Sequence, residues 1–572
     1  MGIFHRWRLT GEGLRDPIKL GRDYPQHPLT TGFYQHPQQP GPEYGSNKPL
    51  DDGFGEAPFG AGFSPGHETS EFRTHETAPL VVNALQDALA VGGLRLVRIL
   101  GWGGNGLACL FAADLEGGKT DFFVVKAALD DGGEGGPDPN QGLYAEKVCT
   151  ALYEGAMHVV QLNKNFFLID PQLPTTLPDL GPDRMMVMEY LKHGTLSHIL
   201  WTVCSRNLKI PSRTLWYMFM CMIKGLIGMN YPPKQHHTDR ANINRTNLWS
   251  ESMPMRGKYP STGGTRTVHF DIDPSNFFVG DLGAGTGSDD HNLCPIIKLA
   301  DFGLAECFHN KQDNGEDLWE QRVMAKDHHL TPEQWSQEWD WIKQCPKDST
   351  ASRFTAGRYD THTNIYQVAL TMACLITQKR PQIPPIPAHL TMIRVTHFPS
   401  IMRWDEAKQG ARPTVRGWTY GSYLLTNHPD WLHVDGDLRN VVAQCMFDAP
   451  HLRPTLQELY YIAVMKLRAY EAANLEHGPD HDDWGSRGEF PMEWAKEPLH
   501  RQPIWTDAKM RAFITEVLEN PERPPSEAGT NDLMEEWDED DEDDEDDDGD
   551  EDDDGDEDDE DDDDEDEEMT GT

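Results

Sequence analysis

The stretch that decides the fold of this chain is His269-Phe270-Asp271-Ile272-Asp273-Pro274-Ser275-Asn276. Within these eight residues a carboxylate, Asp271, stands five positions before an amide, Asn276. Carboxylate and amide oxygens are ligands that Mg²⁺ accepts in proteins, and a tight loop can hold both beside one ion. The stretch therefore predicts a loop suited to the chemistry of magnesium-bound phosphates.

A second stretch, Ile296-Ile297-Lys298-Leu299-Ala300-Asp301-Phe302-Gly303, follows downstream and reads as an apolar strand that delivers Asp301 at its end. In this order, the two stretches resemble the H-R-D-L-x-x-x-N loop and the D-F-G triplet of the eukaryotic protein kinases. The distance between them is longer than usual by about a dozen residues, which the Gly/Asp-rich segment near 281–293 accounts for. The loop's spelling, HFDIDPSN, is also similar to that of divergent fungal kinase-like proteins.

The resemblance covers about residues 90–470. It implies an α+β, bilobal protein-kinase-like fold, with a small β-rich N-lobe and a larger helical C-lobe. We assign residues 88–470 to this domain. Residues 1–87, rich in Gly and Pro, are expected to be a disordered extension. Residues 471–532 are expected to be a partly ordered extension, and 533–572 a disordered acidic tail.

A glycine-rich hairpin is expected near the start of this domain. Residues 94–100 alternate as a strand does, and Gly101-Trp102-Gly103-Gly104-Asn105-Gly106 follows with G-x-G-x-x-G spacing. A second strand continues after the last glycine, where a dinucleotide-binding fold would place a helix. By resemblance, Gly101, Gly103 and Gly106 let backbone N–H groups approach the phosphates of ATP. A merely glycine-rich surface hairpin is the alternative.

Lys126 ends the apolar strand Phe122-Phe123-Val124-Val125-Lys126-Ala127, as a lysine does in the family's V-A-I-K segment. The resemblance implies that Lys126 binds the α- and β-phosphates and pairs with a glutamate on the next helix. Residues 144–152 read as a helix with one apolar face, and Glu146 on this helix is the predicted partner. Glu154 is the alternative partner, and a solvated helix-face role for Glu146 also stays open.

The run Met185-Met186-Val187-Met188-Glu189-Tyr190-Leu191 reads as the strand that leads into the hinge between the lobes. By its position, Met188 would lie behind the adenine, and Glu189 to Leu191 would offer backbone hydrogen bonds. Ordinary core packing explains the apolar residues equally well, so only their position argues for nucleotide contact.

Phosphoryl transfer depends mainly on positioning and electrostatics. The resemblance gives Asp271 the role of orienting a substrate hydroxyl and accepting its proton. It makes Asn276 and Asp301 the ligands of Mg²⁺, while Lys126 and Glu146 complete the predicted catalytic set. ATP and Mg²⁺ are thus the predicted cosubstrate and cofactor, and a Ser or Thr hydroxyl of a protein is the predicted acceptor.

Two residues depart from the family's pattern. Phe270 replaces the arginine that would meet a phosphate on the activation segment, which makes the loop non-RD, so switching by that route is not expected. Asp273 stands where Ser/Thr kinases carry a lysine near the γ-phosphate. Like charges ~4 Å apart repel by about 4 kcal/mol at an effective dielectric near 20. Asp273 must therefore turn away, share a metal, or receive a cation from the substrate.

The activation segment is expected to span 301–333, because the residues around Pro332 and Glu333 resemble the family's A-P-E. Arg453 stands where the family places the buried arginine that pairs with this glutamate. Asn364 replaces the usual aspartate of the following helix, and its amide oxygen can still accept hydrogen bonds from the catalytic loop.

The chain's charge is concentrated near its end. Lys and Arg total 50 against 95 Asp and Glu, and without the 31 acids of residues 535–568 the net charge changes from −45 to −14. Adjacent like charges repel, so this run is expected to stay disordered, either as solubilising padding or as a site for a basic protein partner. Direct nucleic-acid binding is disfavoured by the charge.

Nine cysteines are scattered without a C-x-x-C pair, so the sequence indicates neither a zinc site nor a disulfide framework. This favours a reducing intracellular location, in the cytoplasm or the nucleus. No stretch approaches ~18 uncharged apolar residues, so no membrane span is expected. Two function classes remain: a protein kinase, or a catalytically weak, pseudokinase-like ATP-binding scaffold.

Overall fold

The computed structural model describes residues 78–91, 93–103, 106–115, 118–128, 139–163, 185–237, 239–244, 247–254, 267–283, 291–308, 318, 321–336, 338–339, 355–382, 385–395, 414–477 and 507–521. They all belong to one unit of the chain, which ends at Thr530. The acidic residues 531–572 form a second unit and lie outside the described residues, as does most of the predicted N-terminal extension.

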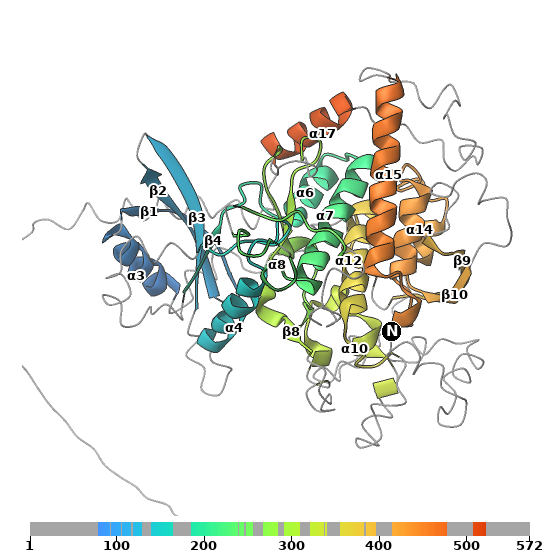
Figure 1. The fold of residues 1–572 in the computed structure, drawn as a ribbon, viewed down its shortest axis with the longest axis horizontal. Coiled ribbons are helices and arrows are strands. Elements are labelled where there is room, and N and C mark those ends of the chain that lie inside the picture. The colour runs from blue at the N-terminus through green and yellow to red at the C-terminus, as the bar shows by residue number, and fades with distance from the viewer. Residues whose placement is uncertain are drawn as a thin grey trace, which may run out of the picture. The chain divides into compact units, whose positions relative to one another are not determined.

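A four-stranded antiparallel sheet forms the N-terminal part of this unit, with the strand order β1-β2-β3-β4. Its elements are α3 (Ala78–Val91), β1 (Leu94–Gly103), β2 (Gly106–Leu115), β3 (Lys119–Ala127), α4 (Pro139–Leu152) and β4 (Met185–Glu189) (Figure 1). In β3, buried and half-buried residues alternate from Phe123 to Ala127, which is the period of two that a strand packed on one face requires.

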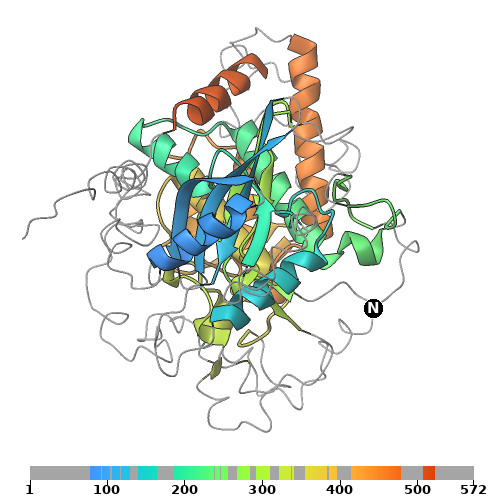
Figure 2. The ribbon, with the colours of Figure 1, turned by 90° about the vertical axis from the view of Figure 1, so that its left-hand side faces the viewer.

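Helix α3 begins at Ala78, inside the segment 1–87 that the sequence assigned to a disordered extension, so that boundary was wrong. Val82, Leu85 and Leu89 recur at helical spacing and are buried. The helix contacts β1 and lies across the sheet (Figure 2). The folded domain therefore starts before residue 88 because the sheet needs an apolar cover.

Helices dominate the remainder of the unit. Its elements are α6 (Leu196–Ser205), α7 (Ser212–Asn230), α8 (Pro233–His236), β5 (Thr267–Val268), η3 (Pro274–Asn276), β6 (Phe277–Val279), β7 (Ile297–Leu299), η4 (Phe302–Leu304), β8 (Glu306–Cys307), η5 (Gln321–Val323), η6 (Asp327–His329), α10 (Pro332–Trp335), α12 (Thr361–Thr377), β9 (Ala388–Ile393), β10 (Thr414–Thr419), η8 (Ser422–Leu425), α14 (Gly436–Cys445), η9 (Pro450–Leu452), α15 (Leu456–His477) and α17 (Asp507–Glu519). The short strands pair as β5 with β8, β6 with β7 and β9 with β10, all antiparallel. The predicted α+β division, a small sheet followed by a larger helical part, is confirmed.

The core of the helical part is built around α7. Almost every residue of this helix is buried, because α12 and α15 pack on it and β7 contacts it as well. Asp360 caps the N-terminus of α12, where its carboxylate accepts from the Thr361 N–H at 2.7 Å. The hairpin of β6 and β7 thus packs against α7, a buried and largely apolar helix.

The C-terminal extension is partly helical and packs on this domain. Helix α15 continues to His477, past the predicted domain boundary at residue 470, so that boundary was set too early. Helix α17 buries Phe513 and Ile514 and contacts α6, and Asp507 at its start pairs with Arg213 at 2.6 Å. The segment 471–532, which the sequence predicted to be partly ordered, thus contains a helix that packs on the domain, while residues 478–506 and 522–532 lie outside the described residues.

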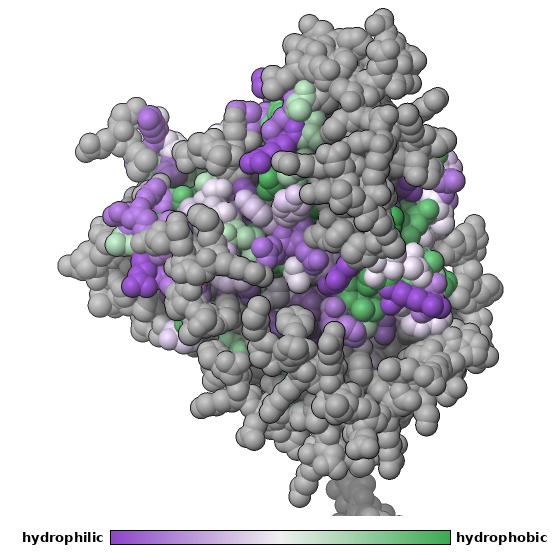
Figure 3. Space-filling view, turned by 45° about the vertical axis from the view of Figure 1, so that its right-hand side comes forward, coloured by the Kyte–Doolittle hydropathy of each residue, from purple (hydrophilic) through white to green (hydrophobic). Residues whose placement is uncertain are grey.

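On the face shown in Figure 3, the described hydrophobic residues occur in small groups between hydrophilic ones. Among the described helices, none is both long and apolar enough to cross a membrane.

Candidate active site

Lys126 lies between two carboxylates. Its Nζ donates a hydrogen bond to Glu146 Oε2 at 2.7 Å and lies 3.6 Å from Asp301 Oδ1. Strand β3 supplies the lysine, α4 the glutamate, and the turn after β7 the aspartate. The side chains of Lys126 and Glu146 are nearly buried, whereas that of Asp301 is 36% exposed. Glu154, the alternative partner, lies in the turn after α4.

The three groups set one another's protonation states. Burial alone would lower the pKa of Lys126, but Asp301 and Glu146 raise it above its ordinary value. Burial alone would raise the pKa of Asp301, but Lys126 holds it below its usual range. Burial raises the pKa of Glu146 to about 7, an increase that Lys126 only partly offsets. Lys126 is therefore charged at neutral pH, and Asp301 presents an ionised carboxylate on the exposed side.

Asp271 and Asn276 face each other within the predicted catalytic loop. Asn276 Nδ2 donates to the backbone oxygen of Asp271 at 2.6 Å and to its Oδ2 at 2.7 Å. Among the described residues, Asp271 Oδ1 is buried without a hydrogen-bond partner. Burial also raises the pKa of Asp271 to about 7. A carboxylate oxygen of this kind can accept a proton from an incoming hydroxyl group.

The β6–β7 hairpin brings the two predicted magnesium ligands together. Phe277 pairs with Leu299, so Asn276 before β6 and Asp301 after β7 lie at the same end of the hairpin. The Ala300 N–H donates to the Asn276 backbone oxygen at 3.0 Å and ties the two segments. Because Asn276 uses Nδ2 toward Asp271, its Oδ1 is left as the atom that could bind a cation. An amide oxygen and an ionised carboxylate are hard donors, so these residues fit Mg²⁺.

His269 and Asn364 fix the predicted catalytic loop through hydrogen bonds. Asn364 accepts from the His269 N–H at 2.9 Å and donates through Nδ2 to the Thr267 backbone oxygen at 2.8 Å. The His269 ring bonds the Ala300 backbone oxygen at 2.9 Å through Nε2, and burial lowers the pKa of His269 to about 4. The neutral ring therefore links the catalytic loop to the D-F-G stretch.

Asp273 turns into the loop, where it is fully buried and caps the turn η3. Its Oδ1 accepts from the backbone N–H groups of Ser275 at 2.6 Å and Asn276 at 3.2 Å. Its Oδ2 forms an ion pair with Lys326 Nζ. The same Nζ lies 3.6 Å from Asp271 Oδ2 and donates to Ser275 Oγ at 2.7 Å.

The cation beside Asp273 thus comes from the chain's own activation segment. The sequence had offered turning away, a shared metal or a substrate cation as the ways to relieve the charge. Turning away agrees with the buried cap that Asp273 forms on η3, whereas the cation from Lys326 was not foreseen. Burial alone would raise the pKa of Asp273, but Lys326 holds it below its ordinary value, while Asp273 and Asp271 raise that of Lys326 against the effect of burial. Sequence reasoning missed Lys326 because no local motif marks it.

Phe270 lies where the family's arginine would stand, and it belongs to an apolar cluster. Its ring packs edge-on against Tyr359 with 5.0 Å between ring centroids, and Leu318 and Trp339 are buried in the same cluster. Its backbone oxygen accepts from Gln367 Nε2. The activation segment is therefore anchored here by apolar contacts rather than by a phosphate and an arginine.

The glycine-rich hairpin is formed by the end of β1 and the start of β2, where Gly103 pairs with Gly106. Gly106 has φ +124°, and a Cβ there would lie 2.1 Å from the Ala127 backbone oxygen. Only glycine fits at this position, because the hairpin passes directly over the residue after Lys126. Gly101 has φ +152° and lies at an irregularity in the pairing of β1 with β2.

The predicted hinge residues lie at the end of β4. Met188 pairs with Val124, and Glu189 pairs with Phe123. The Glu189 N–H donates to the Gln161 backbone oxygen at 3.0 Å, and its carboxylate pairs with Lys298 at 2.7 Å. Because the Glu189 N–H is already bonded, an adenine could bind the backbone carbonyl oxygen of Glu189 and the backbone N–H of Leu191.

The expected pair between Glu333 and Arg453 is formed and fully buried. Two parallel hydrogen bonds join the groups, Nη1 to Oε1 at 2.7 Å and Nη2 to Oε2 at 2.9 Å. Arg453 also lies over the Tyr366 ring, 4.8 Å from its centroid. The end of the activation segment is thereby fixed to η9 and α12.

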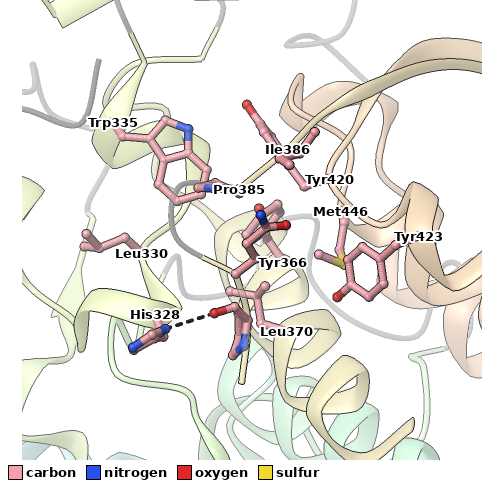
Figure 4. A pocket seen from close by; sticks show the side chains of 12 residues that line it. His328, Leu330, Trp335, Tyr366, Leu370, Pro385, Ile386, Tyr420, Tyr423 and Met446 are labelled. Carbon is pink, nitrogen blue, oxygen red and sulfur yellow. Dashed lines mark hydrogen bonds between the residues drawn. The ribbon is translucent and has the colours of Figure 1, made fainter. Parts of the chain in front are cut away.

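A pocket lined by aromatic side chains lies between the end of the activation segment and α12 (Figure 4). Trp335, Tyr366, Tyr420 and Tyr423 line it, and the His328 ring bonds the Pro381 backbone oxygen at 2.9 Å at its edge. None of the predicted catalytic residues lines this pocket. The candidate active site is therefore defined by the side chains around Lys126 and Asp271, and this pocket is separate from it.

Two known proteins resemble parts of this chain. No family model matches the chain. Over 259 residues, 45% of its length, the chain is 22% identical to the G2-specific protein kinase nim-1 of Neurospora crassa. Over this stretch the chain is similar to a protein kinase. It covers 23% of the nim-1 sequence. Among solved structures, the CAK complex from Chaetomium thermophilum bound to ATP-gamma-S matches 66% of this chain and 93% of that chain, with 14% identity and a TM-score of 0.38.

Proposed function

We propose that this protein is an ATP-dependent protein kinase that transfers the γ-phosphoryl group of ATP to Ser or Thr hydroxyls of protein substrates. The observation that carries the proposal is the position of Lys126, held by Glu146 at 2.7 Å and 3.6 Å from Asp301. A lysine with two carboxylate partners is fixed in place, and the exposed side of Asp301 faces the position a metal-bound phosphate would take.

In this proposal the nucleotide lies between the sheet and the catalytic loop. Lys126 binds the α- and β-phosphates, and the glycines Gly101, Gly103 and Gly106 allow the hairpin to cover them. Met188 packs on the adenine, while the Glu189 carbonyl and the Leu191 N–H bond its edge. Asn276 and Asp301 would hold Mg²⁺, which supplies charge neutralisation to the phosphates when it is bound.

Asp271 acts on the acceptor. The hydroxyl oxygen of the substrate forms a bond to the γ-phosphorus, and the bond from that phosphorus to the β–γ bridging oxygen breaks, so ADP leaves. The hydroxyl proton passes to the carboxylate of Asp271, whose Oδ1 has no other partner among the described residues. Asn276 holds the other carboxylate oxygen and fixes the direction of this transfer.

Lys326 supplies the cation that Ser/Thr kinases place at the position of Asp273. Its Nζ lies 3.6 Å from Asp271 Oδ2 and is held by the buried Asp273. A charge at this place is well situated to stabilise the negative charge on the transferred group. Since Phe270 removes the arginine of the usual phosphate switch, the kinase is of the non-RD type, with its activation segment set by packing and by Lys326.

The substrate side of the proposal is a protein. The acidic residues 535–568 would attract a basic partner, and any such effect should weaken with salt. The described cysteines are free thiols, which supports a reducing compartment, in the cytoplasm or the nucleus.

Nucleotide binding and phosphate transfer are tested separately on the purified full chain. Thermal stabilisation should require both ATP and Mg²⁺ and should shrink in Asp301→Asn, with the exposed Asp281→Asn as the matched control. Transfer of labelled γ-phosphate to generic basic and acidic protein substrates should follow. Stabilisation without transfer to any substrate would favour the scaffold reading, and no stabilisation at millimolar nucleotide would refute the proposal.

A further inference from the structure

Three buried side chains with metal-binding atoms meet in the core of the helical part. They are His158, Cys221 and His291, and one ligand atom from each lies within 4.8 Å of the others. They come from the loop after α4, from the middle of α7 and from the segment before β7. None of them belongs to the candidate active site.

The position of His158 is fixed by a carboxylate. Its Nδ1 lies 2.6 Å from Glu251 Oε2, and its backbone N–H donates to Glu251 Oε1 at 2.8 Å. Both side chains of this pair are fully buried. A carboxylate on one ring nitrogen leaves Nε2 as the ligand atom and orients the ring, as the outer partners of metal-bound histidines do.

The same segment holds a second cysteine, a candidate for a fourth ligand. Cys294 follows His291 by three positions in the same segment and is buried, but it lies outside the group of three whose ligand atoms are within 4.8 Å of one another. Thiolate and imidazole are the donors that zinc prefers, at about 2.3 Å for sulfur and about 2.0 Å for nitrogen. Ligand atoms around such an ion are about 3.5 Å apart, so the three atoms, which lie within 4.8 Å of one another, would draw together when the ion binds.

We propose that His158, Cys221 and His291 bind a structural zinc ion, and that the buried Cys294, three positions after His291, moves in as the fourth ligand. The thiolates and the Glu251 carboxylate offset the charge of a divalent ion, which an apolar core demands. The cluster is closed to solvent, and all its groups are buried, which is typical of a structural site rather than a catalytic one.

The site would stiffen the strand that carries Asp301. The Leu299 N–H at the end of β7 donates to the His158 backbone oxygen at 2.9 Å, and β7 begins three residues after Cys294. Binding of an ion would therefore fix both ends of this strand. His291 and Cys294 lie at the end of the lengthened segment between the catalytic loop and the D-F-G triplet. In this proposal, the role of that insertion is to supply metal ligands.

The test is the metal content of the untagged full chain purified without added metal. We expect about one zinc ion per chain, retained through dialysis against a weak chelator. Replacement by Co²⁺ should give sulfur-to-cobalt charge-transfer absorption, a signal that the magnesium site, which has no thiolate, cannot produce. Asp301→Asn should leave this signal unchanged.

Variants assign the ligands. Cys221→Ser and His291→Ala should each lower the zinc content at least about tenfold, the lower end of effects seen when a metal site loses support. Cys374→Ser, a buried thiol on α12 outside the cluster, is the matched control and should retain zinc. Wild-type protein with less than about a tenth of an equivalent of metal, and with no thiolate-to-cobalt absorption after Co²⁺ addition, would overturn the proposal and leave a metal-free hydrogen-bonded cluster.

Discussion

The proposed nucleotide side and the proposed acceptor side of the candidate active site are built in different ways. On the nucleotide side, Lys126, Glu146 and Asp301 stand at the positions that the family resemblance predicts, and the lysine is held between the two carboxylates. On the acceptor side, an acid replaces the usual lysine, and Lys326 from the activation segment restores the positive charge.

In this site the location of a charge in space therefore matters more than its position along the chain. An acid is tolerated at position 273 because the Asp273 side chain caps η3 and forms an ion pair with Lys326. An apolar residue is tolerated at position 270, where the family has an arginine, because the Phe270 ring packs against Tyr359 and Phe308. On the proposed acceptor side, contacts with the predicted activation segment thus take the place of the charged residues that the family carries in the loop.

The largest effect is expected on the acceptor side. Asp271→Asn should lower the turnover rate between about 100- and 10,000-fold, the usual range for a positioned general base. Nucleotide binding should not change, because the contacts of Lys126 stay intact. Steady-state kinetics with a thermal-shift titration of ATP checks both, with Asp281→Asn as the exposed control. A variant that keeps full turnover would remove Asp271 from its proposed role.

Breaking the buried anchor of the activation segment should act on stability. Arg453→Met leaves Glu333 buried without its partner, which should cost about 3 to 5 kcal/mol in the free energy of unfolding. Arg206→Met, which removes a more exposed ion pair with Glu516, should cost less than about 1 kcal/mol. Urea denaturation measures both. Equal losses in the two variants would show that the buried pair does not anchor the segment.

The sequence predicted the nucleotide side better than the acceptor side for a physical reason. Lys126, Asn276 and Asp301 lie in short motifs whose backbone geometry is local, so their spacing determines where they point. Lys326 reaches Asp273 only because the activation segment folds back, and no local pattern carries that information. The choice between Glu146 and Glu154 likewise needed the end of α4, which lies between them.

The start of the domain could have been found from the sequence. Val82, Leu85 and Leu89 have helical spacing, but the Gly- and Pro-rich residues before them suggested a longer extension. The cluster of His158, Cys221 and His291 could not have been found from the sequence, because its members come from three distant segments and form no motif with a recognisable spacing.

Acid should destabilise the loop region through two buried histidines. Burial lowers the pKa of both His269 and His329 to about 4, below the value of about 6.5 for an unfolded histidine. A lowered pKa means that the stability from a neutral ring is complete above pH ~6.5 and is lost as the pH falls toward ~4, by up to about 3 kcal/mol for each ring.

His329→Phe should therefore reduce the difference between the free energies of unfolding at pH 7 and pH 5, whereas the exposed His389→Gln should not. Denaturant unfolding at both pH values measures this difference. An unchanged pH dependence in His329→Phe would show that this ring does not sense acid.

The smallest effect is expected at the chain's acidic end. Deleting residues 533–572 should leave the melting temperature and the basal transfer rate nearly unchanged, because this run offers few apolar residues with which to dock. Thermal melts and kinetics of the truncated protein check this. A melting temperature several degrees lower would mean that the run packs on the domain.

The most direct test of the account compares transfer rates of the wild type, Lys326→Met, Asp273→Lys and the double variant Asp273→Lys/Lys326→Asp, each first shown to melt cooperatively. If Lys326 supplies the missing cation, Lys326→Met should lose about 100-fold in turnover. Asp273→Lys alone should also lose activity, because it loses the cap of η3 and repels Lys326. The double variant, which returns the lysine to the loop, should regain at least about tenfold over Lys326→Met. Full activity of Lys326→Met, or a double variant no faster than Lys326→Met, would contradict the claim that the activation segment provides this charge.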